Sequence, residues 1–280
     1  MKKLQTLLGI ALSAVVLNAG LTASAQPAQP GYATVVRVKG EASYSLDGGA
    51  HKYPLVAGKF LEPSVGTVIY TGASGVVDVV LGKAIDLPQA KWVPERISLA
   101  VDSPVRGMIT YKPSAEQNVV RVMESSQVAL EKLTTTSSGA DTVSDTELNL
   151  QKGSIFASVK KLSAAAQYLV KTPTGIAGVR GTQFSIELND DGTIKRVVVY
   201  KTQHDDGLVL AITPASGPPE TILISAGEIW EPGYPAPKPI TSELRMFLQT
   251  IFSALRTIYI EQVNYDYDRT QSRESTDFGF

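Results

Sequence analysis

The sequence predicts a mainly β protein, an antiparallel β-sandwich or roll followed by one C-terminal amphipathic helix. Short apolar runs, several with alternating polarity, recur from residue 31 onward. Glycine and proline turn signals separate them at intervals of about 8–12 residues, as in all-β sandwiches and barrels. No helical pattern lies between these runs, which argues against a parallel α/β sheet. Only beyond residue 240 do apolar residues recur every three or four positions, which indicates a helix.

Residues 1–25 have the features of a signal peptide and are left out of the predicted fold. Lys2 and Lys3 precede the apolar stretch 4–21, and a small-residue A-x-A signal ends at Ala25. An uncleaved anchor is the alternative, because the apolar stretch is near the minimum spanning length. We expect cleavage after Ala25, a periplasmic or secreted protein, and no transmembrane span in the mature chain.

Composition excludes several classes of partner and site. The 280 residues are 43% hydrophobic and 19% charged, which is ordinary for a globular protein. Without Lys2 and Lys3 the basic residues fall from 26 to 24 against 27 acidic ones, a net charge of −3. A chain with a negative net charge is poorly suited to neutralise the phosphates of a nucleic acid, so no nucleic-acid partner is expected. With no cysteine, it has no disulfide and no thiolate metal site.

The predicted β domain spans residues 31–232. In its first part we expect strands at 35–38, 42–46, 51–55, 68–70 and 76–81, with a hairpin at 47–49. Residues 83–117 carry four prolines and a lone Trp92, and they are predicted to be an insertion of extended segments. Trp92 is a candidate partner-binding residue, since loops on a rigid scaffold often bind; a tolerated variable loop is the alternative. The polar residues 134–139 are expected to be a flexible connection.

The stretch Gly153–Leu188 carries the densest pattern in the chain. Residues 155–160 alternate as in a strand with two different faces, and residues 168–171 indicate a second strand. The segment 172–182 follows, with three glycines spaced three residues apart, each able to adopt positive φ. Phe184 begins a further strand, and a turn at 189–192 leads to a returning strand at 194–200.

The string Thr-Pro-x-Gly-x-Ala-x-x-Arg-Gly-Thr-x-Phe at 172–184 closely resembles the signature of FecR-type domains, a β-rich extracytoplasmic module. The residues singled out as this structural motif are Thr172, Pro173, Gly175, Gly178, Arg180, Gly181, Thr182 and Phe184. The glycine spacing in 40–72 resembles the front half of the same family, and the resemblance resumes near Asn118.

The resemblance implies a relay: full-length relatives sense an outer-membrane receptor and control a sigma factor through a cytoplasmic N-terminal segment. We expect no counterpart of that segment here, because only the signal peptide precedes the β domain. What the resemblance leaves is a non-enzymatic module that binds a protein or polymer at the cell envelope.

Catalytic, metal and cofactor signals are scarce. His51 and His204 both fall in predicted turns, and no nucleophile elbow is present. The acidic clusters at 190–192 and 204–207 lack calcium-loop spacing and are explained by turns. Arg180-Gly181-Thr182 runs into a strand, so the helix that supports a phosphate loop is missing. We therefore expect no catalytic residue, no metal and no cofactor, and Arg180 should pin its turn by donating several hydrogen bonds.

After the β domain we expect a proline-rich linker at 233–240, a helix at 241–262 with Ser242 as N-cap, and a disordered tail at 263–280. The pattern G-x-Φ-Φ-E-P (Φ, apolar) occurs at 58–63 and again at 227–232, which suggests that the two halves of the domain turn alike.

The apolar face of the predicted helix must be covered. It comprises Leu244, Leu248, Ile251, Leu255 and Ile258, which are further candidate partner-binding residues. Packing on its own domain is the default; a partner, a second copy or a membrane surface are the alternatives. An alternative function follows, a structural or adhesive envelope component that forms homo-oligomers through this helix.

Overall fold

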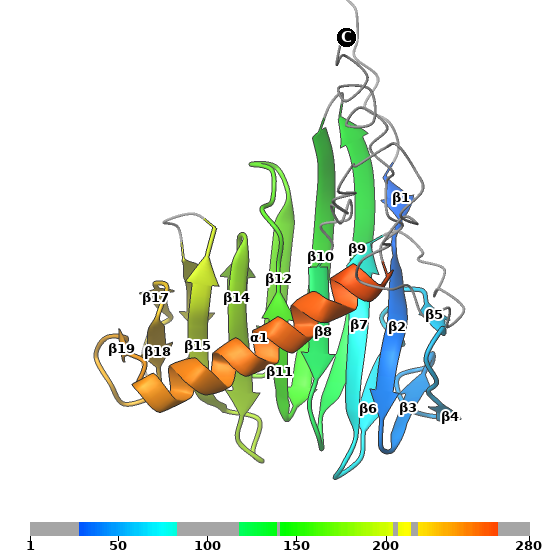
Figure 1. Cartoon of the computed structure of the whole chain (residues 1–280), viewed down its shortest axis with the longest axis horizontal. Helices are drawn as coiled ribbons and strands as arrows, with labels where there is room; N and C mark the ends of the chain where they lie inside the picture. The colour runs from blue at the N-terminus through cyan, green and yellow to red at the C-terminus, as the bar shows by residue number, and fades with distance from the viewer. Residues whose placement is uncertain (1–27, 83–117, 139–140, 204–206, 214–217, 263–280) are drawn as a thin grey trace, which may run out of the picture.

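The computed structural model describes residues 28–82, 118–138, 141–203, 207–213 and 218–262. They form two stacked β-sheets and one C-terminal helix, which confirms the predicted mainly β fold (Figure 1). Sheet A has the strand order β17-β16-β13-β12-β10-β9-β6-β3-β4, with β1 beside β9. Sheet B has the order β19-β18-β15-β14-β11-β8-β7-β2-β5.

The bounds of the strands follow from their backbone pairing. Those of sheet A are β1 (Gln29–Pro30), β3 (Ala42–Ser45), β4 (Tyr53–Pro54), β6 (Val68–Thr71), β9 (Gln127–Ser138), β10 (Asp141–Lys152), β12 (Gln167–Thr172), β13 (Gly175–Val179), β16 (Leu208–Ile212) and β17 (Glu220–Ile224). Those of sheet B are β2 (Tyr32–Lys39), β5 (Phe60–Leu61), β7 (Val76–Gly82), β8 (Asn118–Val122), β11 (Ser154–Ser158), β14 (Thr182–Leu188), β15 (Ile194–Thr202), β18 (Glu228–Trp230) and β19 (Lys238–Pro239).

The chain passes back and forth between the two sheets. Neighbouring strands pair antiparallel, except that β10 and β12 run parallel. The intervening β11 lies in sheet B, so the chain re-enters sheet A in its original direction. A strand of the opposite sheet thus makes the crossover that a helix makes in α/β folds.

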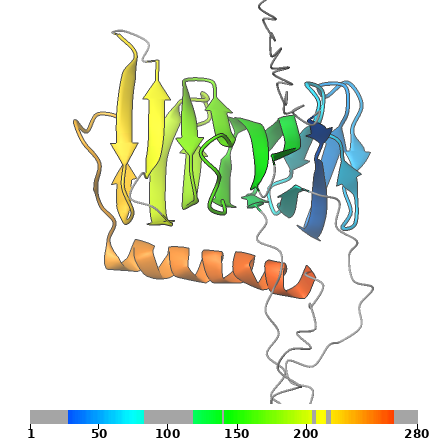
Figure 2. The same ribbon diagram turned by 90° about the horizontal axis from the view of Figure 1, so that it is seen from above.

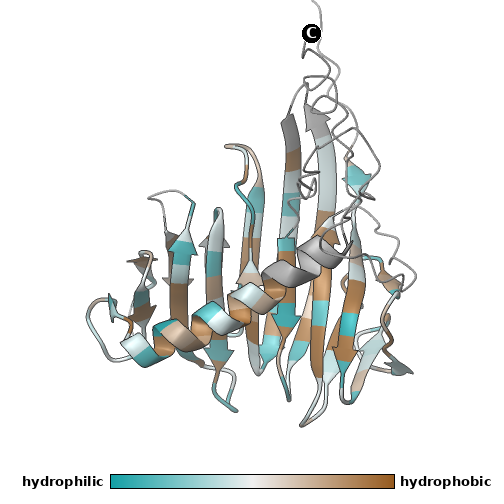
Figure 3. Ribbon diagram, in the orientation of Figure 1, coloured by the Kyte–Doolittle hydropathy of each residue, from teal (hydrophilic) through white to brown (hydrophobic). Residues whose placement is uncertain are grey.

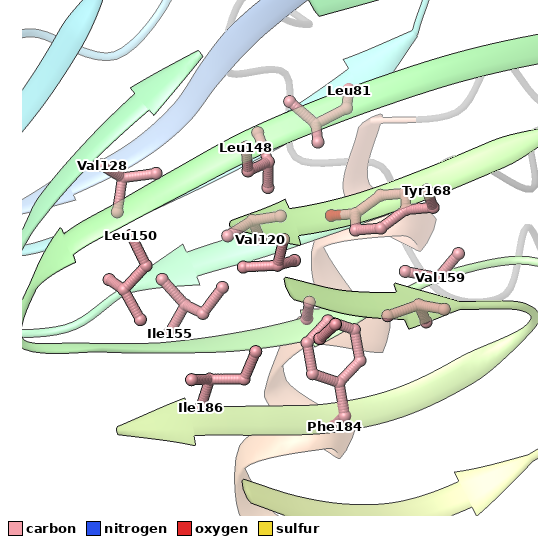
Figure 4. Close-up of a cluster of buried hydrophobic side chains, with 14 of the residues drawn as sticks. Leu81, Val120, Val128, Leu148, Leu150, Ile155, Val159, Tyr168, Phe184 and Ile186 are labelled. Atoms are coloured by element: carbon pink, nitrogen blue, oxygen red, sulfur yellow. The ribbon is translucent and has the colours of Figure 1, made fainter. Parts of the chain in front are cut away.

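The core lies between the sheets. Alternation places Ile155 and Ala157 of β11 inside, fully buried, while Phe156 points to the outer face of sheet B. Figure 4 shows the interdigitated inner side chains, with Leu148, Leu150 and Tyr168 from sheet A meeting Val120, Ile155, Phe184 and Ile186 from sheet B. The period-2 patterns at 155–159 and 184–188 therefore mark core strands, as predicted.

Helix α1 (Ser242–Gln262) lies diagonally across the outer face of sheet B, from β18 toward β7 and β2 (Figures 1 and 2). Phe252 is stacked on Tyr200 of β15, with ring centroids 5.4 Å apart, and meets Phe156 edge-on. Sheet B therefore packs apolar residues on both of its faces, and Figure 3 shows hydrophobic residues along the strands beneath the helix. The default expectation, packing on its own domain, is confirmed. Within the described residues, no helix is long and apolar enough to cross a membrane.

Three local expectations were wrong. Residues 134–138 belong to the long strand β9, because threonine is β-branched and suits an extended backbone. Residues 238–239 of the proline-rich linker form β19, which pairs with β18 and fixes the entry to the helix. The N-cap is Thr241 and not Ser242, since the Thr241 hydroxyl accepts a hydrogen bond from the Leu244 N–H at 3.2 Å.

The repeated G-x-Φ-Φ-E-P pattern has the same structure at both places. Gly58 and Gly227 have φ of +88° and +79°, and their N–H groups donate to the carbonyls of Val35 and Val199 at 2.7 and 2.8 Å. Each pattern then forms a short strand of sheet B, β5 beside β2 and β18 beside β15. The expectation that both halves turn alike is confirmed at this site.

Candidate functional site

The FecR-like motif divides into a hairpin, a strand and a crossing between sheets. The Thr172 hydroxyl donates to the Gly175 carbonyl at 3.0 Å across the turn between β12 and β13. Gly175 and Gly178 then lie inside β13, which pairs with both β12 and β16. Of the three motif glycines only Gly181 has positive φ, at +64°. Positive φ is therefore confined to Gly181, where the chain leaves sheet A for sheet B.

Backbone and hydroxyl groups hold that crossing. The Thr182 hydroxyl donates to the Arg180 carbonyl at 3.2 Å, and the Gln203 N–H donates to the Gly181 carbonyl at 2.7 Å. Phe184 follows and is fully buried in the core. These contacts give the end of the motif a structural role.

Arg180 contributes less to this turn than expected. Its Nη2 donates one hydrogen bond, to the Ser163 carbonyl at 3.1 Å, and the described residues hold no carboxylate paired with it. A guanidinium carries five N–H donors, so most of its capacity is uncommitted within the described structure. The side chain is half-buried.

Most of the candidate partner-binding residues on the helix face pack against the protein's own sheet B. Leu248 and Leu255 are buried against sheet B, and Leu244 and Ile251 pack at the edge of the same cluster. The backbone of Ile258 lies in α1, but its side chain falls outside the described residues, as does Trp92. While the helix stays in place, the face read from the sequence is unavailable to a partner.

The outer face of sheet A carries an exposed aliphatic strip. Across β17, β16, β13 and β12 the residues Leu223, Val209, Gly178 and Leu169 lie opposite one another in register. Leu223 is 52% exposed and Val209 44%, and Ile176 on β13 is 43% exposed. Among the described elements, none covers this strip, whereas α1 covers the outer face of sheet B.

A groove of about 580 Å³ opens within this strip. Aliphatic residues form two of its walls, with Leu169 and Val209 on either side and Ala166 from the preceding loop, and Gln167 adds a polar side chain to the lining. Gly178 lies between these walls, and Arg180 and Gly207 lie at the end of the groove. The volume falls in the range of small-molecule sites.

A buried ion pair on sheet B escaped the sequence analysis. Arg121 of β8 binds Asp78 of β7 through two hydrogen bonds, Nε–Oδ1 at 2.6 Å and Nη2–Oδ2 at 2.9 Å. Asp78 is fully buried, and Arg37 of β2 approaches it at 3.8 Å. One signal could have revealed the pair, because each of the two apolar strands carries a single charged residue.

A polar network crosses sheet A beside the strip. Lys171 bridges Glu147 at 2.7 Å and Glu131 at 2.9 Å, and these hydrogen bonds raise the pKa of Lys171 to about 12. Desolvation acts to raise the pKa of Glu131, but hydrogen bonds from Lys171 and Asn149 outweigh it and leave that pKa below its ordinary value. The charged groups of this network pair with one another, so the network borders the strip and leaves no unpaired charge there for a ligand.

The described residues show no arrangement suited to acyl transfer or metal binding. His51 is exposed in its turn, as predicted, and its Nδ1 lies 2.6 Å from Asp47 Oδ2. The Ser45 hydroxyl donates to Asp47 at 2.7 Å and not to the imidazole, so no base is placed to activate it. Hydrogen bonds from Ser45 and His51 hold the pKa of Asp47 well below its usual range. Within the described part of the chain, no three acidic or imidazole groups cluster as a metal site.

Comparison with known proteins places the motif in a family. Residues 111–203 match the family model described as FecR protein. This region therefore is a FecR-type domain, as the motif indicated. The match begins inside the predicted insertion 83–117 and does not reach the front half, residues 31–82. No curated protein matches the chain significantly.

Two crystal structures of a protein from Parabacteroides distasonis ATCC 8503, described as a candidate anti-sigma factor, are similar to this chain. Each shares 15% identity and covers 57% of this chain and 79% of its own, with TM-scores of 0.32 and 0.31. At these TM-scores the likeness carries no inference about function.

Proposed function

We propose that the chain is an exported, non-enzymatic FecR-type module that binds a protein at the cell envelope as part of a signalling system. The single observation that carries this proposal is the asymmetry of the two outer faces. Helix α1 covers the apolar outer face of sheet B, while the aliphatic strip of sheet A is left bare among the described elements.

An exposed apolar surface of this kind indicates recognition, because water leaves it favourably when a partner covers it. The strip spans four neighbouring strands of a rigid sheet, so it presents a preformed surface that needs no ordering before binding. The family resemblance and the leader sequence support an extracytoplasmic setting for this contact.

Capture from envelope extracts tests the proposal with matched variants. Immobilised mature protein should retain a specific partner that Val209→Glu loses, because a charge in the strip would have to be desolvated on binding. Met246→Glu is the control: Met246 is 62% exposed on α1 and lies outside the strip. Capture that survives Val209→Glu, or fails equally in both variants, would contradict a role for sheet A.

Self-association through the helix, the alternative function, is tested by light scattering. We expect the mature chain to be monomeric, because the apolar face of α1 already packs against sheet B. A dimer that disappears when residues 240–280 are removed would favour the alternative.

A further inference from the structure

We propose that the groove at Gly178 and Arg180 is a subsite for a carboxylate attached to an aliphatic body, such as the end or an acidic position of a bound peptide. In naming a peptide as the source, this inference rests on the proposed function. The groove itself rests on three independent observations: the glycine that leaves it open, the uncommitted guanidinium and the aliphatic walls.

Gly178 is a glycine that the fold does not require. It lies inside β13 with no register shift against β12 or β16, and its φ is not positive. A Cβ added there would lie 3.8 Å from the Val209 carbonyl oxygen, an ordinary van der Waals contact. Gly175 differs, since its added Cβ would lie 2.7 Å from the Ala211 carbonyl oxygen.

Glycine inside a strand destabilises it and often marks a bulge, a bend or the close approach of a ligand. At Gly178 the regular register excludes a bulge, and the space beside the Cα leaves room for a Cβ. The missing side chain interrupts the row Leu223, Val209, Gly178, Leu169, and this gap creates the floor of the groove. We infer that the groove is kept open for an occupant.

Arg180 determines the charge of that occupant. Among the described residues that line the groove, it alone carries a charge, and its single hydrogen bond to the Ser163 carbonyl leaves N–H donors for an anion. Guanidinium groups bind carboxylates through two parallel hydrogen bonds. The aliphatic walls, Leu169, Val209 and Ala166, would contact an apolar group next to that carboxylate.

Titration with N-acetyl-leucine, followed by two-dimensional amide NMR of the mature protein, tests the subsite directly. We expect saturable shifts at Gly178 and Val209, and none with N-acetyl-leucinamide, which lacks the charge. Arg180→Gln should weaken binding about 10-fold or more, the effect of losing a charge-assisted hydrogen bond. Lys195→Gln makes the same charge change at an exposed site on sheet B and should bind like wild type.

Gly178→Val separates the ligand site from the fold. Valine suits a strand, so the variant should melt at the wild-type temperature or higher, yet its side chain would fill the floor and abolish the shifts. A lower melting temperature, equal binding of acid and amide, or unchanged binding in Arg180→Gln would each overturn the subsite. Partner capture without carboxylate shifts would overturn this inference alone, whereas shifts without partner capture would leave the subsite standing and contradict the proposed function.

Discussion

Replacing Phe252 by alanine tests whether α1 is an integral part of the fold. Phe252 is 3% exposed, its ring is stacked on Tyr200 with planes 7° apart, and it meets Phe156 at 6.2 Å. Truncating a buried phenylalanine costs about 3–5 kcal/mol, to which each aromatic pair contributes about 0.5–1.5 kcal/mol. Because α1 packs on the outside of sheet B, it can detach instead of leaving a cavity, which limits the loss to the free energy of docking.

We therefore expect Phe252→Ala to lower the free energy of unfolding by about 3 kcal/mol, near the lower bound for a buried ring. For a domain of this size, that loss lowers the melting temperature by about 6–12 °C. Urea unfolding measures the free energy, and amide hydrogen exchange shows whether α1 itself opens. Met246→Ala, on the exposed side of the same helix, should change stability by less than about 0.5 kcal/mol. Equal effects of the two substitutions, or unprotected α1 amides in the wild type, would refute the docked helix.

Three further predictions concern the sheets. Asp78→Asn should destabilise by about 3–5 kcal/mol in urea unfolding, because it leaves the Arg121 charge buried without its partner; a loss under about 1 kcal/mol would contradict this. Lys171→Met should cost about 0.5–1 kcal/mol, discounted for exposure. The contribution of Lys171 to the free energy of unfolding should be complete below pH 10.5 and should vanish as pH rises through about 12. The contribution of Glu131 to the same free energy should be complete above pH 4.5 and should fade as pH falls below that value. Urea unfolding across pH measures both, and a pH-independent difference between wild type and variant would refute them. Gly181→Ala should cost about 1–2 kcal/mol because its φ is positive, measured by thermal melting against Gly178→Ala, which should not destabilise.

The sequence was sufficient to predict the strands whose apolar residues recur with period 2. Ile155, Ala157 and Phe184 alternate with outward residues, and each of the three is fully buried. The sequence did not predict β13, because glycines contribute no side chain to a periodic pattern. The segment 172–182 was therefore interpreted as a turn. The sequence also failed at residues 134–138, where polarity outweighed the strand preference of threonine.

Long-range features of the candidate site lay beyond local patterns. Asp78 and Arg121 are 43 residues apart and meet only through the register of β7 and β8. Whether the helix face is covered and the strip at Val209 is bare depends on which sheet lies under α1. The periodicity of the sequence cannot specify that sheet. The helix was correctly predicted to need a cover, but the recognition face could be proposed only after that cover was located.

Photocrosslinking tests most directly whether sheet A, and not the helix, presents the recognition surface. A photoreactive amino acid would replace Val209 or, separately, Met246 in cells that produce the protein. We expect a specific crosslinked adduct from position 209 and none from position 246. Crosslinking from position 246 alone, or from neither position while a partner still co-purifies, would contradict a recognition surface on sheet A.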